Sequence, residues 1–88
     1  MVTIKNNKDR LLHRMKIIQG HLKKVMKMIE EDAYCIDVVH QSLALQKALK
    51  QVDMLIMEEH LQSCAVDQIK NGQEDKTIAE LISIYKYK

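Results

Sequence analysis

Helix-breaking residues are almost absent from this chain, which contains no proline and only two glycines, Gly20 and Gly72. Hairpins and sheet turns depend on glycine, proline and asparagine at positions of special backbone geometry. Helices have no such need, so the sequence predicts an all-α protein of three helices. With 88 residues the chain is short enough for one domain, residues 1–88. A domain of this size buries little surface, so we expect self-association to add stability.

Apolar residues recur at alternating steps of four and three, the spacing of helices that pack lengthwise on one another. The first helix should span about residues 5–31 and the second about 34–69. A short third helix is predicted near 76–85, after the polar stretch KNGQED. We expect Asp32 to be the N-cap of the second helix, and Gly20 to mark close helix packing. The repeating positions are Leu11, Met15, Ile18, Leu22, Val25 and Ile29, then Val38, Ser42, Leu45, Leu49, Val52 and Ile56.

The second predicted helix is apolar on more than one face. Besides its heptad positions it carries a further apolar stripe, which the first helix alone is too narrow to cover. A second copy of the chain is the expected cover. The residues of this stripe are Val39, Leu43, Met54, Leu55, Met57 and Leu61.

Charge is distributed unevenly along the chain. Eight basic residues precede residue 28 against one acidic residue, whereas residues 28–88 hold six basic and eleven acidic ones. A charge run is often only a solvated surface, but one sign concentrated on one helix suits a polyanion. The early basic residues are Lys5, Lys8, Arg10, Arg14, Lys16, Lys23, Lys24 and Lys27.

The start of the chain, MVTIKNNKDR, lacks the apolar centre of a signal peptide, and no apolar run of membrane-spanning length follows. We therefore expect a cytoplasmic protein without a membrane partner, whose two cysteines form no structural disulfide. Paired carboxylates, a Ser-His-Asp set and a glycine-rich phosphate loop are all missing from the sequence, so an enzyme is not expected.

One histidine and both cysteines form the most informative pattern. His60 and Cys64 are four residues apart, which places them on one helix face. With Cys35 they make a soft donor set that suits Cu(I) or Zn(II). In a continuous helix Cys35 and His60 would be about 37 Å apart, so one chain is unable to bring them to one ion. An antiparallel homodimer crossing near Ala48 solves this, because each Cys35 then meets the partner's His60 and Cys64.

The metal and the role of the pair stay open on these grounds. Zinc ordinarily takes a fourth ligand, whereas Cu(I) accepts three, which favours copper without excluding zinc. The alternative interpretation of the His60–Cys64 pair involves no metal: a structural cysteine lies beside a solvated histidine. Three other histidines, His13, His21 and His40, are interpreted as surface or interface residues.

The stretch LHRMKIIQGHLKKVMKMIEEDAYCIDV, followed by EEHLQSC, resembles the copper-sensitive operon repressor (CsoR) family of bacterial regulators. The resemblance covers nearly the whole chain, and its specific part is the Cys, then His-x-x-x-Cys, at this spacing. It implies an antiparallel helical dimer with a four-helix bundle, paired into a tetramer. It also implies operator DNA as a partner, and release of that DNA when Cu(I) binds.

Position by position, the resemblance implies roles for particular residues. Cys35, His60 and Cys64 would be Cu(I) ligands, and Tyr34 and Glu80 would link the His60 imidazole to the third helix. Taken alone, Tyr34 reads as core and Glu80 as a solvated charge. Arg14 and Lys16 match basic positions of the family's DNA-binding face, and Gln51 departs from an arginine common there. We expect the DNA surface to include Lys8, Arg10, Arg14, Lys16 and Lys50.

Two other functions are compatible with parts of this pattern. A persulfide or thiol-redox sensor would use Cys35 and Cys64 as a pair across subunits, but would not need His60. A metal-buffering protein would use all three ligands, but would not need the basic first helix. Loss of the inducer response in His60→Ala, and salt-dependent binding to duplex DNA, separate these alternatives from a copper-responsive repressor.

Overall fold

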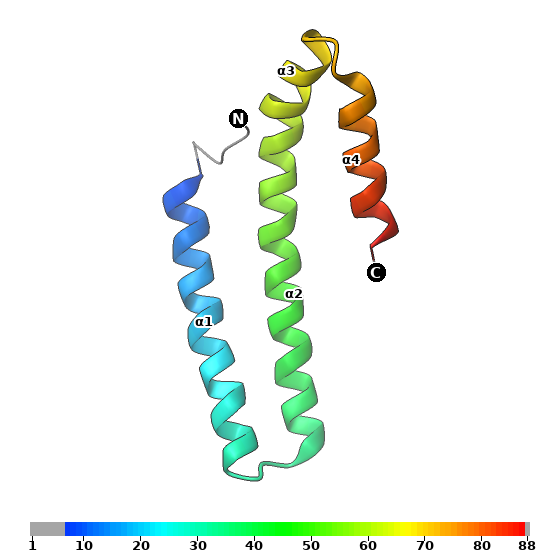
Figure 1. The fold of residues 1–88 in the computed structure, drawn as a ribbon. Coiled ribbons are helices and arrows are strands. Elements are labelled where there is room, and N and C mark those ends of the chain that lie inside the picture. The colour runs from blue at the N-terminus through cyan, green and yellow to red at the C-terminus, as the bar shows by residue number, and fades with distance from the viewer. Residues whose placement is uncertain (1–6, 88) are drawn as a thin grey trace. The chain divides into compact units, whose positions relative to one another are not determined.

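The computed structural model describes residues 7–87, and every regular element in that range is helical (Figure 1). A long first helix is followed by a long helical run, Cys35 to Lys70, and by a final helix, so the all-α, three-helix prediction is confirmed. None of the described helices is both long and apolar enough to cross a bilayer. The elements are α1 (Lys8–Glu30), α2 (Cys35–Glu59), the π-helical segment η1 (His60–Cys64), α3 (Ala65–Lys70) and α4 (Glu74–Lys86).

The predicted boundaries hold to within two residues at most ends. Residues 5 and 6 of the first predicted helix lie outside the described residues. The second helix was expected to be regular to residue 69, and this is wrong in one respect: α-helical geometry stops at Glu59 and resumes at Ala65. The final helix begins two residues earlier than predicted, at Glu74, because Glu74 and Asp75 are favourable in a first turn.

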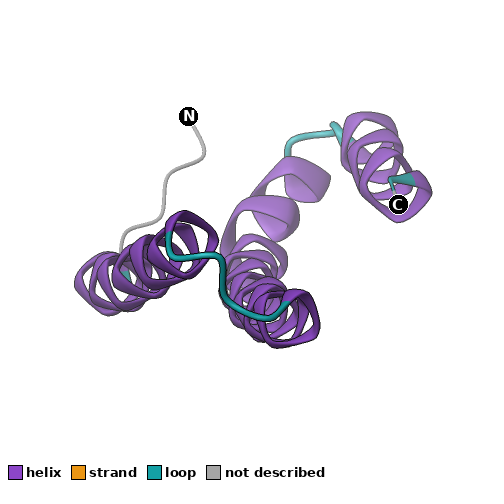
Figure 2. Cartoon of the chain, turned by 90° about the horizontal axis from the view of Figure 1, so that it is seen from below, coloured by secondary structure: helices purple, strands orange, loops and turns teal. Residues whose placement is uncertain are grey.

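Two compact units make up the described chain. The hairpin unit, residues 7–56, contains α1 and most of α2, which lie side by side and antiparallel (Figures 1 and 2). The C-terminal unit, residues 57–87, contains the end of α2, η1, α3 and α4.

The turn between α1 and α2 corrects the expectation for Asp32. The backbone N–H of Asp32 donates to Ile29 O at 3.2 Å, and that of Ala33 donates to Met28 O at 2.9 Å. This pair of bonds, with Asp32 at a φ of 56°, is the Schellman motif that closes a helix at its C-terminus. Asp32 therefore ends α1 rather than capping α2, which begins three residues later at Cys35.

The turn between α3 and α4 repeats the same motif with a glycine. Gly72, at a φ of 77°, donates its N–H to Ile69 O at 3.1 Å, and Gln73 donates to Gln68 O at 2.7 Å. Glycine has no Cβ, so it adopts this left-handed conformation without a steric penalty.

The core of the hairpin unit is narrow. Leu11 and Val25 on α1, and Leu45 and Val52 on α2, are the buried apolar residues of this unit. Other heptad positions remain open: Met15, Leu22 and Ile29 are 43%, 47% and 60% exposed. Two helices bury only the stripe along which they touch, so the rest of each apolar face stays uncovered within one chain.

The expectation that Gly20 marks close packing is wrong for the single chain. A Cβ placed on Gly20 would meet no atom within 4 Å. The helix tolerates this glycine in its interior, at a penalty of about 1 kcal/mol relative to alanine.

Candidate functional site

His60 and Cys64 are the first and last residues of η1, and both are half-buried. The N–H of Ala65 donates to His60 O, a bond to the fifth residue back that defines the π-helical turn. Single π-helical turns inside α-helices are rare and occur frequently at functional sites. The only departure from α-helical geometry in the described run from Cys35 to Lys70 thus coincides with the His-x-x-x-Cys motif.

A hydroxyl supports this turn from within. Ser63 Oγ donates to Glu59 O at 2.7 Å, and lies 3.6 Å from Cys64 Sγ. Side-chain bonds of this kind compete with the regular backbone bond and bend helices. Ser63 therefore helps to hold the loosened turn on which both predicted ligands sit.

Cys35 and Tyr34 lie at the start of α2, in the hairpin unit. Cys35 is the first helical residue and is exposed. The carbonyl of Tyr34 accepts the first intrahelical bond, from Val38 N at 3.2 Å, and the Tyr34 side chain is 67% exposed. The reading of Tyr34 as core is therefore wrong within one chain.

Among the described residues of one chain, no three His, Cys, Asp or Glu side chains gather as possible metal ligands. Cys35 is the first residue of the 25-residue helix α2 and His60 directly follows its last residue, so His60 comes 25 positions after Cys35 in the sequence. The ligand set Cys35, His60 and Cys64 stays a prediction that requires a second chain.

Glu80 has an unusual environment for a surface carboxylate. Its Oε1 is buried and has no hydrogen-bond partner among the described residues. The reading of Glu80 as a solvated charge is thus wrong for this oxygen. Buried polar atoms in native proteins are nearly always paired, so an unpaired carboxylate oxygen indicates a missing donor. An imidazole N–H has the chemistry to be that donor, as the resemblance implies for His60.

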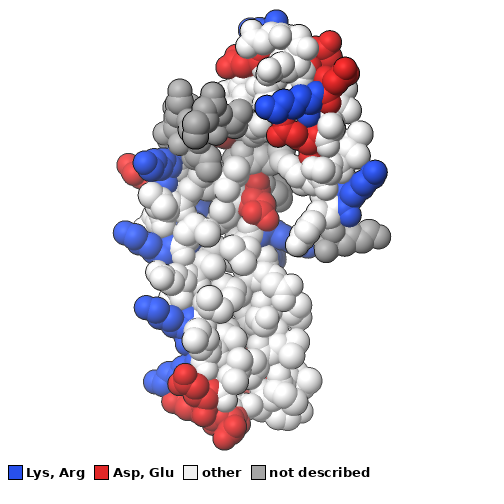
Figure 3. Space-filling model, in the orientation of Figure 1, with Lys and Arg blue, Asp and Glu red and all other residues white. Residues whose placement is uncertain are grey.

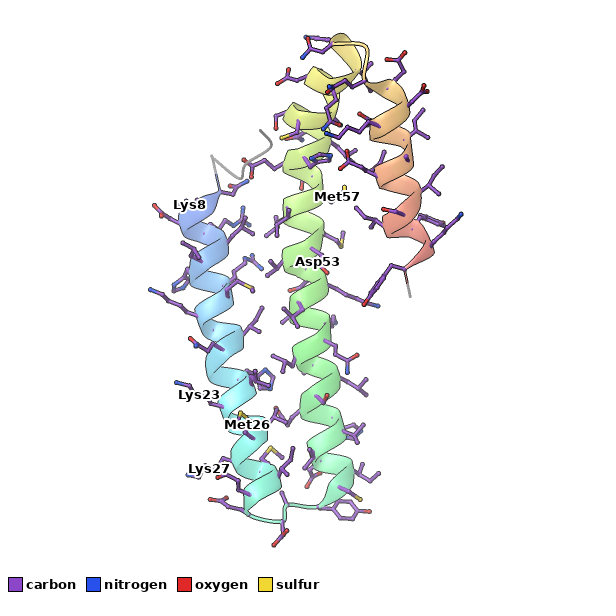
Figure 4. All side chains as sticks on the ribbon, in the orientation of Figure 1. Lys8, Lys23, Met26, Lys27, Asp53 and Met57 are labelled. Carbon is purple, nitrogen blue, oxygen red and sulfur yellow. The ribbon has the colours of Figure 1, made fainter. Side chains whose placement is uncertain are left out.

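The basic residues predicted to contact DNA lie mainly on α1. Figure 3 shows Lys and Arg side chains following one another along the edge of α1, next to a mostly uncharged surface. In Figure 4 the side chains of Lys23 and Lys27 extend away from α2. Lys27 Nζ lies 3.8 Å from Glu31 Oε1, an exposed pair of small energetic value. The predicted DNA-contacting residues that are exposed are Lys8, Arg10, Lys16 and Lys50.

Arg14 and Gln51 meet at one feature of the hairpin unit. Both line an open, largely apolar cavity of about 360 Å³ between α1 and α2, which His13 also lines. The position at which the sequence departs from the family pattern, Gln51, therefore lines the same cavity as the predicted DNA contact Arg14. Further along the hairpin, His21 Nε2 donates to Gln41 Oε1 at 2.9 Å, which gives His21 a role in joining the two helices.

Sequence reasoning missed two features near the predicted ligands. No residue of HLQSC is a helix breaker, so nothing in the sequence signals the π-helical turn. The second is a buried hydrogen bond from Thr77 Oγ1 to Gln68 Oε1, of 2.7 Å, between α4 and α3. The sequence offered one indication of this bond. Gln68 and Thr77 are polar residues at helical spacing from Ala65 and Glu80.

Comparison with known proteins finds relatives that are all described as metal-sensitive or copper-sensing transcriptional repressors. The family model for metal-sensitive transcriptional repressors matches residues 7–87. The copper-sensing transcriptional repressor CsoR of Bacillus subtilis (strain 168) is 37% identical over 79 residues, which are 90% of this chain and 78% of that protein. CsoR of Mycobacterium tuberculosis (strain H37Rv) is 36% identical over 76 residues, 86% of this chain and 64% of that protein.

A solved structure has the same fold. The crystal structure of the copper-sensing repressor CsoR with Cu(I) from Geobacillus thermodenitrificans NG80-2 matches with a TM-score of 0.87 at 33% identity. The match covers 98% of this chain and 91% of that one. On the family model and these identities, the chain belongs to the family of metal-sensitive transcriptional repressors.

Proposed function

We propose that this protein is a Cu(I)-responsive transcriptional repressor, which binds operator DNA when metal-free and leaves it when Cu(I) binds. It acts in the cytoplasm as an antiparallel homodimer that pairs into a tetramer, and it derepresses genes of copper resistance. The observation that carries the proposal is the soft donor set Cys35, His60 and Cys64, in a chain 33–37% identical to proteins named as copper-sensing repressors.

The residues present fit copper. Two thiolates and one imidazole are soft ligands, and this set lacks the oxygen donors that harder divalent ions favour. Cu(I), when bound, supplies a cation that ties the two cysteines and the histidine together across the dimer. The Oε1 of Glu80 is buried and unpaired among the described residues, and a carboxylate oxygen can accept the N–H of an imidazole whose other nitrogen binds a metal, which supports the pairing of Glu80 with His60. Glu80 then connects the ligand set to α4.

The basic residues of α1 support DNA as the partner. Contacts of Lys and Arg with phosphate are largely independent of sequence and weaken steeply with salt. A metal-buffering protein would have no use for this concentration of exposed cations on one helix.

The test is an anaerobic Cu(I) titration in the presence of DNA duplexes, selected from a random pool by the metal-free protein. We expect about one Cu(I) per chain and a fall in DNA affinity of roughly 5- to 150-fold, the usual range of allosteric coupling. Full DNA affinity in the copper-loaded protein would disprove the proposal.

The variant His60→Ala separates copper from persulfide as the inducer. In a copper sensor this variant loses the response to Cu(I), because one ligand is gone. In a persulfide sensor, whose Cys35 and Cys64 are oxidised by the inducer, the variant keeps its response to persulfide. Zn(II) titrated in parallel distinguishes the metals, since zinc with three protein ligands keeps a fourth position open.

A further inference from the structure

Gln68 and Thr77 are the two buried polar residues of the described chain, with 7% and 3% of their surface exposed. Thr77 Oγ1 donates to Gln68 Oε1 at 2.7 Å, and so joins α3 to α4 inside the C-terminal unit. Neither residue is a metal ligand or a DNA contact in the proposed function, so their burial needs another explanation.

The backbone around this pair fixes the same geometry. Gln68 O accepts the N–H of Gln73 at 2.7 Å, and Gln73 O in turn accepts the N–H of Thr77 at 3.1 Å. Thr77 Oγ1 also lies 3.2 Å from Gln73 O, but its single proton serves the shorter bond to Gln68. Backbone and side chain therefore hold α3 and α4 in one arrangement through the Gln68–Thr77 pair.

The pair lies between the residues that carry the proposed copper response. Gln68 follows Cys64 by four residues, which places it one turn further along the same helix face. Thr77 precedes Glu80 by three residues, and both belong to the side of α4 that is withdrawn from solvent. The Gln68–Thr77 pair thus ties the helix of His60 and Cys64 to the helix of Glu80.

Buried hydrogen bonds of this kind favour discrete states. Leaving a buried amide oxygen or hydroxyl without a partner lowers the free energy of unfolding by more than the formed hydrogen bond adds to it. In such surroundings small displacements are disfavoured, and an element moves as a unit or not at all.

We infer that Gln68 and Thr77 are positioning residues, which hold α4 in register with the His60–Cys64 segment so that α4 follows changes there as one body. This inference rests on the proposed function, and adds to it the residues that transmit the copper signal to α4. It assigns them no contact with the metal.

The experiment compares three variants with the wild-type protein. Thr77→Val keeps the shape but removes the donor, Thr77→Ser keeps the hydroxyl, and the double variant Thr77→Val with Gln68→Leu removes both polar groups. Each is measured for Cu(I) affinity without DNA, for unfolding stability, and for the ratio of DNA affinities without and with Cu(I). Amide hydrogen exchange along α4 is measured in the metal-free proteins.

In Thr77→Val we expect the ratio of DNA affinities to fall about three- to tenfold and exchange in α4 to accelerate, with Cu(I) affinity within about threefold of wild type. Thr77→Ser should behave as wild type. The double variant should regain stability, since no polar group is left unpaired, but not the ratio. That combination separates signal transmission from simple stability.

Several results would overturn the inference. The inference is refuted if Thr77→Val keeps the wild-type ratio of DNA affinities without and with Cu(I). It is also refuted if the double variant regains both this ratio and its stability. If amide hydrogen exchange in α4 of metal-free Thr77→Val equals that of the wild type, Thr77 does not hold α4 in register. A wild-type protein whose DNA affinity ignores Cu(I) refutes the proposed function itself, and the transmission role with it.

Discussion

Asp32 and Gly72 occupy the same place in two successive turns, the left-handed residue that follows a helix. Their φ angles are 56° and 77°. In this region the Cβ of an L-residue crowds the neighbouring carbonyl, and aspartate tolerates this better than most residues but less well than glycine. Asp32 therefore holds backbone strain that Gly72 does not.

Replacing Asp32 by glycine should raise the free energy of unfolding by about 0.5–1 kcal/mol, because relief of the left-handed strain exceeds the entropy that glycine adds to the unfolded chain. Urea denaturation followed by circular dichroism measures this. The matched control is Glu31→Gly, where φ is −91° and glycine brings only the entropy, so stability should fall. A less stable Asp32→Gly protein would contradict the strain argument.

The two glycines should respond to alanine with opposite signs. Gly72→Ala should lower stability by about 1 kcal/mol because alanine disfavours the left-handed region. Gly20→Ala should raise it by about 0.5–1 kcal/mol, since Gly20 lies inside α1 with nothing within 4 Å of an added Cβ. Thermal unfolding of both variants provides the comparison. A destabilised Gly20→Ala protein would mean that another chain approaches this face.

Arg14 should contribute one phosphate contact. Arg14→Ala is expected to weaken DNA binding about equally for all duplexes, and to reduce the slope of log affinity against log salt by about one. Fluorescence anisotropy at several salt concentrations measures both effects. Lys76→Ala, an exposed cation on α4 outside the predicted DNA surface, serves as the control and should leave the slope unchanged. An Arg14→Ala protein with the wild-type slope would exclude a phosphate contact at this position.

At the scale of elements, the π-helical segment η1 is the feature that sets this chain apart from a plain helical bundle. This irregular turn begins at His60 and ends at Cys64, the two predicted ligands that are close in sequence. Within it the Ser63 hydroxyl donates a hydrogen bond to the Glu59 carbonyl. A π-helical turn has poorer backbone bonding than an α-helix, so it persists where surrounding packing or function favours it.

Deleting Gln62 should convert the bond to the fifth residue back into an ordinary α-helical one. We expect helix content by circular dichroism to be kept, and Cu(I) affinity to fall at least about tenfold, because the His60–Cys64 spacing changes and ligand placement with it. Gln62→Ala, which keeps the chain length at an exposed position, should bind Cu(I) as wild type. Undiminished copper binding by the deletion variant would show that the turn has no part in the site.

At the scale of the whole molecule, one chain leaves large apolar residues exposed along both long helices. Leu43 and Met54 are 54% and 71% exposed, and the hairpin surface in Figure 3 is mostly uncharged between its basic edge and its acidic turn. Monomeric proteins rarely expose contiguous apolar surfaces of this kind. A second copy would cover that surface, and under the proposed function it would also bring its Cys35 to His60 and Cys64.

Ligand sharing across an antiparallel dimer predicts complementation between two inactive variants. Cys35→Ser and Cys64→Ser proteins should each lose tight Cu(I) binding, since every site in either dimer lacks a thiolate. In a co-expressed equal mixture, half of the dimers are mixed, and each mixed dimer keeps one complete site. Cu(I) titration should then find about one quarter of a tight site per chain. A mixture without any tight site would argue against ligand sharing.

Much of the fold followed from residue patterns. The lack of proline and the four-three spacing predicted α1 and the run from Cys35 to Lys70, because helix formation depends on local spacing and the absence of breakers. The spacing of His60 and Cys64 predicted their shared helix face for the same reason. The exposed apolar stripe likewise followed from composition and period, without knowledge of any partner.

Other features depended on contacts between residues far apart in sequence. The sequence alone determined that this chain is helical, where its helices run and which residue types carry soft donors, since these are local properties. The folded structure was needed to show that Asp32 ends α1, that a π-helical turn carries the His60–Cys64 pair, and that Gln68 and Thr77 are buried together. Burial and backbone bonding are settled by the neighbours that folding brings, and a single sequence does not name those neighbours.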